Sequence, residues 1–161
     1  MLSIRPATPE DAGLICAYIR ELAEYEHLLH EAVATEADLS AALFCDQPKV
    51  FCDMVEWDGQ PAGFALWFYT FSTFRGRHGI YLEDLYVRPE FRGRGAGKAL
   101  LTNLARRCAA DRLGRLEWAV LNWNVPSIAF YESLGARPMS DWTVYRLTGD
   151  DLDTLAKRED G

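Results

Sequence analysis

The sequence predicts an α/β fold in which a mixed central sheet is flanked by helices, and three observations lead to this prediction. Segments with strand and helix patterns follow one another in the order β-α-α-β-β-β-α-β-α-β. The 161 residues contain no internal repeat or linker-like stretch, so residues 1–161 are predicted to form one domain with a buried core. Asp58-Gly59 separates two apolar runs, which predicts a hairpin and a mostly antiparallel N-terminal half.

Composition and charge exclude several classes of protein. A hydrophobic content of 49%, with five Trp, seven Tyr and eight Phe, excludes a disordered chain. The formal net charge is −7, which disfavours nucleic acid as a partner and favours a cationic one. No apolar run is long enough to span a bilayer, and the N-terminus lacks a signal-peptide pattern, so no membrane partner is expected.

The cysteines and histidines predict neither a disulfide framework nor a metal site. Cys16, Cys45, Cys52 and Cys108 are widely spaced and form no Cys-x-x-Cys pair. The three histidines are scattered along the chain. This pattern is typical of thiols in a reducing compartment, so a cytoplasmic location is expected.

The first part of the chain is predicted to contain a strand and two helices. Residues 2–5 alternate like a short strand. Thr8, followed by proline and two acids, is typical of a helix N-cap, and apolar residues at helical spacing extend that helix to about Leu29. Thr35 repeats the N-cap pattern and predicts a short helix to about Phe44.

Three further strands are predicted in the middle of the chain. Residues 50–57 and 62–71 form the two arms of the expected hairpin. Residues 71–79, which end in glycines, are expected to form a mobile loop. Residues 80–87 then return to a strand pattern.

A glycine segment follows this strand and leads into a predicted helix over 95–111. Gly93, Gly95 and Gly97 precede a run of good helix formers, so several backbone N–H groups gather at a helix N-terminus, which is a ready anion site. The spacing fits neither a P-loop nor a dinucleotide fingerprint, so a different anion is expected. A tight turn without a ligand is the alternative interpretation.

The last part of the chain is predicted to contain two strands around a helix. Residues 116–121 read as a strand, and a break leads into a helix over 127–134 that Gly135 stops. Residues 143–147 have a strand pattern. The charged tail from Asp150 is expected to form one helical turn followed by disorder.

Several segments resemble a known family. Arg92, Gly95 and Gly97 fill the signature Arg/Gln-x-x-Gly-x-Gly/Ala of the GNAT N-acetyltransferase superfamily. Within it, the chain resembles the spermidine/spermine (diamine) acetyltransferase family over residues 4–8, 21–26, 81–84 and 123–131. Ser72-Thr73-Phe74 and residues 119–124 resemble the thialysine branch of that family, so a short amine or lysine-like amino acid is favoured over spermidine.

The resemblance implies the GNAT fold, in which a bulge splays one strand from the next and opens a V-shaped slot for acetyl-CoA. It implies acetyl-CoA as the donor, no metal, and a homodimer with acceptor sites near the subunit boundary. The residues implied to hold acetyl-CoA are Leu85, Tyr86, Val87, Arg92, Gly93, Arg94, Gly95, Ala96, Gly97, Lys98, Asn124, Val125, Pro126 and Ser127.

Acetyl transfer to an alkyl ammonium needs a base to remove a proton and an acid to protonate the thiolate, and no covalent intermediate. The resemblance implies that Tyr131 is the acid and that Glu83 serves in deprotonation through water. A core aromatic and a strand acid paired with an arginine are the alternatives. The role of Asp84 stays open, since it would lie on the opposite face of the strand unless a bulge changes the alternation. A backbone N–H near Leu85 could stabilise the oxyanion.

The expected acceptor is a small organic cation, because carboxylates and aromatic faces together bind such groups. The resemblance implies contacts from Tyr25, Glu26, Glu83, Glu117, Trp118 and Ala119. The sequence thus predicts an acetyl-CoA-dependent N-acetyltransferase acting on a diamine, polyamine or thialysine-like amino acid by direct attack in a ternary complex. A protein lysine or N-terminal acetyltransferase and a non-catalytic acyl-CoA-binding sensor are the alternatives.

Overall fold

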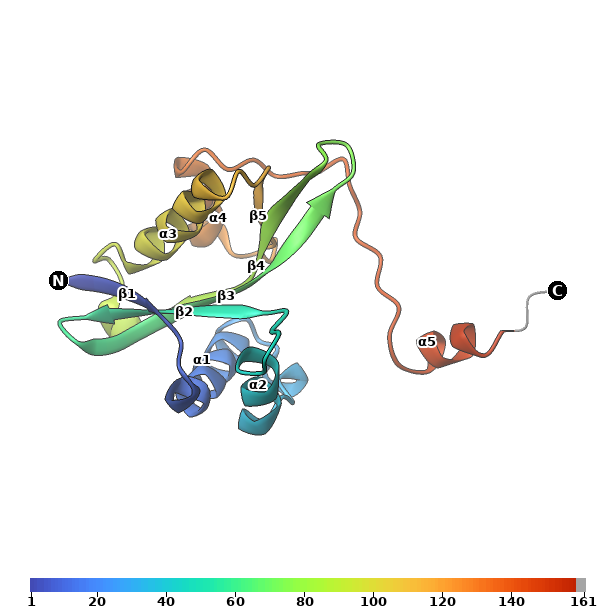
Figure 1. The fold of residues 1–161 in the computed structure, drawn as a ribbon, viewed down its shortest axis with the longest axis horizontal. Coiled ribbons are helices and arrows are strands. Elements are labelled where there is room, and N and C mark those ends of the chain that lie inside the picture. The colour runs from blue at the N-terminus through green and yellow to red at the C-terminus, as the bar shows by residue number, and fades with distance from the viewer. Residues whose placement is uncertain (159–161) are drawn as a thin grey trace. The chain divides into compact units, whose positions relative to one another are not determined.

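The computed structural model describes residues 1–158, and their contacts divide the chain into two compact units, Met1–Leu121 and Asn122–Gly161 (Figure 1). The first unit contains the whole sheet, and the second contains two helices. In chain order the elements are β1 (Leu2–Pro6), α1 (Ala12–Tyr25), α2 (Glu36–Leu43), β2 (Phe51–Trp57), β3 (Gln60–Ser72), β4 (Arg77–Val87), α3 (Ala96–Ala110), β5 (Leu116–Trp118), α4 (Val125–Ser133) and α5 (Gly149–Ala156).

The five strands form one mixed sheet in the order of the chain. The pairs from β1 to β4 are antiparallel, and β5 runs parallel to β4 because α3 crosses between them. In the first unit, α1 and α2 cover one face of the sheet and α3 covers the other (Figure 1). We call these the α1 face and the α3 face. The predicted α/β class with a mixed sheet is confirmed.

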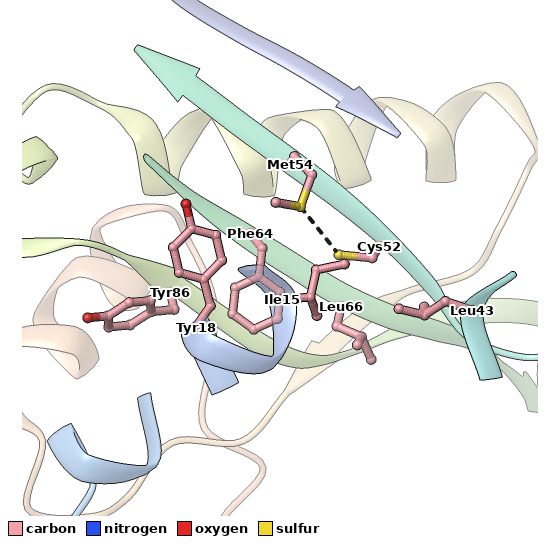
Figure 2. Packing of buried hydrophobic residues seen from close by; sticks show 8 residues of the cluster. All are labelled: Ile15, Tyr18, Leu43, Cys52, Met54, Phe64, Leu66 and Tyr86. Atoms are coloured by element: carbon pink, nitrogen blue, oxygen red, sulfur yellow. Dashed lines mark hydrogen bonds between the residues drawn. The ribbon is translucent and has the colours of Figure 1, made fainter. Parts of the chain in front are cut away.

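The α1 face carries the larger cluster of buried side chains. Its buried members are Ile15, Tyr18, Leu43, Cys52, Met54, Phe64, Leu66 and Tyr86 (Figure 2). The ring of Tyr18 stacks on that of Phe64 with centroids 5.5 Å apart, and the Cys52 Sγ lies 3.9 Å from the Met54 Sδ. Since burying a large apolar side chain contributes about 1.5–3 kcal/mol, this cluster holds α1 against β3 and β4.

Three local predictions are confirmed by the backbone. Asp58 and Gly59 have φ of 47° and 78°, the two positive values that a type I′ hairpin turn requires. At the start of α2, the Thr35 hydroxyl accepts from the Asp38 N–H at 3.2 Å, and the Asp38 carboxylate accepts from the Thr35 N–H at 2.9 Å. Gly135 ends α4 with φ of 89°.

The predicted end of the first helix is wrong. It begins with a 3₁₀ turn over Pro9–Asp11, and α1 ends at Tyr25 rather than near Leu29. His27 takes a left-handed conformation with φ of 60°, and the Leu28 N–H donates to the Ala23 carbonyl at 2.8 Å. This is a helix-ending arrangement usually built on glycine, so the histidine did not indicate it.

The predicted mobile loop over 71–79 is also wrong. Strand β3 continues to Ser72 and β4 begins at Arg77, which leaves only a short turn between them. Phe71 pairs with His78 across the strands, with ring centroids 5.0 Å apart. Cross-strand pairing therefore turns most of the expected loop into strand.

Several predictions for the last part of the chain need correction. The strand over 116–121 stops at Trp118, and α4 begins at Val125 rather than 127, because Asn124 caps the helix. Residues 143–147 form no strand and are exposed. The tail forms the eight-residue helix α5 rather than one turn, and the disorder expected after it lies partly outside the described residues.

Candidate active site

The glycine segment between β4 and α3 is open to a ligand. Gly93 and Gly95 have φ of 77° and 82°, which strain any residue with a side chain. Gly95 is the N-cap of α3, and no side chain caps this helix end. A Cβ added at Gly93 or Gly97 would meet no atom within 4 Å. The uncapped N–H groups at the start of α3 therefore have the space and the dipole that suit a phosphate.

Two arginine side chains of this segment contact neighbouring elements. The Arg92 Nε–H donates to the Val87 carbonyl at 2.8 Å, and its guanidinium lies 5.4 Å from the ring centroid of Tyr25 and 5.7 Å from that of Tyr86. The guanidinium of Arg94 lies 4.9 Å from a ring centroid of Trp57. Arg92 thus connects the predicted donor segment to Tyr25, a predicted acceptor contact at the end of α1.

The two halves of β4 have different neighbours. Ile80–Leu82 pair with β3 on one side and with β5 on the other. Beyond Leu82, the pairing found among residues 1–158 joins β4 to β3 alone. The Arg88 N–H donates to the Ala62 carbonyl of β3 at 2.9 Å. Because backbone groups alternate in direction along an antiparallel ladder, the N–H and carbonyl of Leu85 point away from β3. This part of β4 has an open edge.

The register of β3 against β4 shifts at Glu83. Leu66 pairs with Asp84 and Trp67 pairs with Leu82, so β4 has one extra residue there. A shift of this kind reverses the alternation of side chains. Leu82 accordingly shares the α3 face with Trp67, whereas Asp84 shares the α1 face with Leu66. The side of Asp84, which the sequence left open, is the α1 face.

Three carboxylates influence one another electrostatically around this shift. Glu83 is exposed and Asp84 is partly buried. Burial, followed by the charges of Glu83 and Glu26, raises the pKa of Asp84 to about 7. Burial also raises the pKa of Glu26, the residue that ends α1. Within residues 1–158 the Asp84 carboxylate has no hydrogen bond or ion pair, so no cation neutralises it.

The predicted acceptor residues of β5 lie beside the same part of β4. Tyr81 pairs in register with Glu117. Burial, with added effects of Glu83 and Glu117, raises the pKa of Tyr81. The Glu117 carboxylate also accepts from Arg115 at 3.1 Å, so it is partly neutralised. Trp118 ends β5, and the exposed Ala119 follows it.

The remaining predicted residues lie in the second unit. Asn124 is buried, and its Oδ1 accepts from the Ser127 N–H at 3.4 Å at the start of α4. Val125 and Pro126 are exposed in the first turn. Tyr131 is partly buried on α4, with its ring 5.6 Å from that of Phe130. The carboxylates and the glycine segment thus belong to the first unit, and Tyr131 belongs to the second.

A buried polar network on the α3 face was not predicted. Asp53 of β2 is buried, and its carboxylate accepts from the Trp67 Nε1–H at 3.0 Å and the Asn103 Nδ2–H at 3.4 Å. The Arg107 guanidinium lies 5.0 Å from a ring centroid of Trp67. The sequence signal that could have indicated this network is Asp53, an acid within the apolar strand 51–57. Likewise, the two adjacent acids Glu83-Asp84 within a β pattern could have indicated the register shift.

Residues 1–158 contain neither a metal-binding cluster nor a membrane-spanning helix. No group of three or more His, Cys, Asp or Glu side chains in this range could hold a metal ion. No helix in the same range is both long and apolar enough to cross a membrane. The four cysteines all lie in this range and are free.

Comparison with known proteins identifies the class that this fold and site define. The model of the acetyltransferase (GNAT) family matches residues 17–136, which is most of the chain. The chain therefore belongs to the GNAT acetyltransferase family and is an N-acetyltransferase. Membership in this family implies acetyl-CoA as the donor.

Individual relatives agree with the branch that the sequence resembles. Thialysine N-epsilon-acetyltransferase of Bos taurus is 35% identical over 95% of this chain and 96% of its own length. L-ornithine N5-acetyltransferase NATA1 of Arabidopsis thaliana is 32% identical over 96% of this chain and 87% of its own length. The solved structure of integron cassette protein VCH_CASS6 from V. cholerae has a TM-score of 0.81 and 27% identity, covering 98% of both chains.

Proposed function

We propose that this N-acetyltransferase acts on a primary amine of a small cationic acceptor, either a diamine or polyamine or a thialysine- or lysine-like amino acid. The observation that carries the proposal is the mutual influence of three acids on β4 and at the end of α1: the charges of Glu83 and Glu26 raise the pKa of Asp84, and no cation within residues 1–158 pairs with it. An ammonium group would supply the missing charge and several hydrogen-bond donors. Relatives named for thialysine and ornithine acetylation favour a short diamino acid.

The first unit has the features that acetyl-CoA binding needs. Acetyl-CoA would supply an activated acetyl thioester. The uncapped start of α3 and the cations Arg92, Arg94 and Lys98 would bind its pyrophosphate. The open edge at Leu85, Tyr86 and Val87 would pair with the amide-rich pantetheine arm, as a peptide adds to a sheet. Asn124, Val125, Pro126 and Ser127 are also proposed as acetyl-CoA contacts, because they resemble a second acetyl-CoA segment of the family.

The register shift and the limited pairing of β5 support the implied V-shaped slot. β5 pairs with β4 only as far as Leu82, and the extra residue Glu83 follows immediately. A bulge at that position would bend β4 away from β5. The proposed slot would place a thioester carbonyl near the Leu85 N–H, which would stabilise the oxyanion.

Tyr131 is the proposed general acid, on the resemblance of residues 130–135 to the family motif. We expect Tyr131→Phe to lower kcat about 100-fold or more, because the thiolate would leave without a proton donor, while KM for acetyl-CoA changes less than about threefold. Tyr145→Phe is the matched control, since Tyr145 is 92% exposed in the same unit. Steady-state kinetics check both variants. An unchanged kcat would remove Tyr131 from the mechanism.

A thiol-release screen tests the proposed function. Purified protein and acetyl-CoA would be mixed with putrescine, spermidine, ornithine, lysine, thialysine and a lysine peptide. We expect the highest kcat/KM with a short diamino acid or diamine. A higher value for the peptide would favour a protein acetyltransferase. Background release with every amine, while acetyl-CoA still binds, would contradict catalysis and favour an acyl-CoA sensor.

We further propose a single N-acetyltransferase domain that acts as a cytoplasmic homodimer. The family match runs from residue 17 to residue 136 and so crosses the boundary between the two units, which supports one domain. The four free cysteines suit a reducing compartment. Light scattering during gel filtration would test the dimer, and a monomer at micromolar concentration would contradict it.

A further inference from the structure

We propose that Asp84, rather than its neighbour Glu83, accepts the proton from the ammonium group of the acceptor. The inference rests on the proposed function, because it assigns a role within that site. Four observations carry it: the register shift, the enclosure of Asp84, the charges around it and the absence of a counter-ion.

The register shift decides where Asp84 points. In a regular strand, Asp84 would share the face of Leu82, which packs on the α3 side. The extra residue Glu83 reverses this order and turns Asp84 to the α1 face, in register with Leu66. The negative charge of Glu26, the C-cap residue of α1, then raises the pKa of Asp84 from a second element.

Within the described part of the chain, the surroundings of Asp84 contain negative charges and no partner of opposite charge. Glu83 acts from its own strand and Glu26 acts from α1. The arginines further along this strand and its loop are engaged elsewhere. Arg88 binds the Glu21 carboxylate at 2.9 Å, and Arg92 donates to the Val87 carbonyl at 2.8 Å. A partly buried carboxylate in this position is stabilised by a proton or by a bound cation.

These surroundings match the properties of a general base. Burial and the two acids raise the pKa of Asp84 to about 7, so the group exchanges protons near neutral pH. A base is most effective when its pKa lies near the working pH. Glu83 is the extra residue of β4 and is exposed. Its negative charge raises the pKa of Asp84. Glu83 thus has a tuning role in this assignment.

The proposed step moves one proton from the ammonium to Asp84 and the acetyl group from sulfur to nitrogen. One N–H proton of the ammonium passes to the Asp84 carboxylate, directly or through water. The lone pair that this exposes on nitrogen forms the C–N bond with the acetyl carbon, and the C–S bond breaks with its electron pair on sulfur. The thiolate takes a proton from Tyr131, its proposed acid. Asp84 later loses its proton to solvent, and Tyr131 regains one.

Profiles of rate against pH distinguish the two acids. We expect wild-type kcat to fall below about pH 7, because protonated Asp84 cannot accept a proton. Asp84→Asn should lower kcat about 100-fold or more and remove this acid limb, with KM for acetyl-CoA within about threefold. Glu83→Gln should lower kcat far less than Asp84→Asn does and should move the limb to lower pH, because removing a negative charge lowers the pKa of Asp84. Glu24→Gln, at an exposed acid of α1, is the matched control and should change neither.

A direct titration gives a readout that does not depend on turnover. Carbon-13 NMR of aspartate carboxyl groups should show one resonance that titrates near pH 7 in the wild type and is missing in Asp84→Asn. In Glu83→Gln that resonance should titrate at lower pH. An acid limb that survives in Asp84→Asn, or a kcat that collapses only in Glu83→Gln, would overturn the assignment. If wild-type protein acetylates no amine while the resonance is present, the proposed function fails instead.

Discussion

Asp53 and Asp84 lie on opposite faces of one sheet, and the contrast between them separates a structural acid from one with a proposed catalytic role. Burial is the main cause that raises the pKa of both carboxyl groups. On the α3 face, a hydrogen bond from Trp67 and the charge of Arg107 lower the pKa of Asp53 again. On the α1 face, Glu83 and Glu26 raise the pKa of Asp84 further.

Burial alone therefore does not identify a catalytic acid, because it is the main cause of the raised pKa in both residues. Asp53 accepts hydrogen bonds from Trp67 of β3 and Asn103 of α3, so its charge helps to hold the helix on the sheet. Asp84 has no such donors within residues 1–158, so its charge opposes folding while the site is empty. Carboxyl groups with strongly raised pKa values cluster at functional sites, which agrees with the role proposed for Asp84.

The largest expected effect is on stability, when each acid is replaced by leucine. Asp53→Leu should lower the free energy of unfolding by about 2–4 kcal/mol, because it leaves the buried Trp67 indole N–H without its acceptor. Asp84→Leu makes the same chemical change on the other face and should cause no loss. Urea unfolding at pH 7.5, followed by tryptophan fluorescence, measures both. Equal losses would contradict the division into structural and functional acids.

The next effect is a pH dependence that Asp84 alone should produce. Its folded-state pKa of about 7 lies above the ordinary value of 3.8, so between these pH values the folded chain binds more protons than the unfolded chain. Stability contributed by this group is therefore present at low pH and lost as pH rises through 7.

Asp84→Asn should accordingly raise the free energy of unfolding by about 1–3 kcal/mol at pH 8 and leave it unchanged at pH 4, since the full linkage value is reduced by solvent. Urea titrations at several pH values measure the difference. A constant difference between wild type and variant across this range would show that Asp84 does not titrate as described.

The smallest effect tests the weaker hydrogen bond of the Asp53 network. The Asn103 Nδ2 lies 3.4 Å from the Asp53 carboxylate, near the limit for such a bond. Asn103→Ala should therefore lower the free energy of unfolding by only about 0.5–1 kcal/mol. Thr102→Ala is the control on the same helix, because the Thr102 hydroxyl donates only to the Lys98 carbonyl within α3. A loss as large as that of Asp53→Leu would mean that Asn103, rather than Trp67, dominates the network.

Features that depend on a few adjacent residues could be predicted. The Asp58-Gly59 turn, the Thr35 cap and the Gly135 stop each depend on a local backbone preference. The helix end at His27, with φ of 60°, could not be predicted, because residues with side chains rarely adopt that conformation. The predicted strand over 143–147 needed a partner strand that no local pattern supplies.

The sequence by itself determined the family and the glycine segment at the start of α3, and it predicted the acids proposed to bind the acceptor. These follow from residue types and short spacings, which motifs preserve. Only the tertiary structure decided which of two adjacent acids is enclosed. The β3–β4 register pairs Leu66 with Asp84 and Trp67 with Leu82, and it is set by packing between segments far apart in the chain. That pairing turns Asp84 toward Glu26 and leaves Glu83 exposed, so the difference between their proposed roles belongs to the folded sheet.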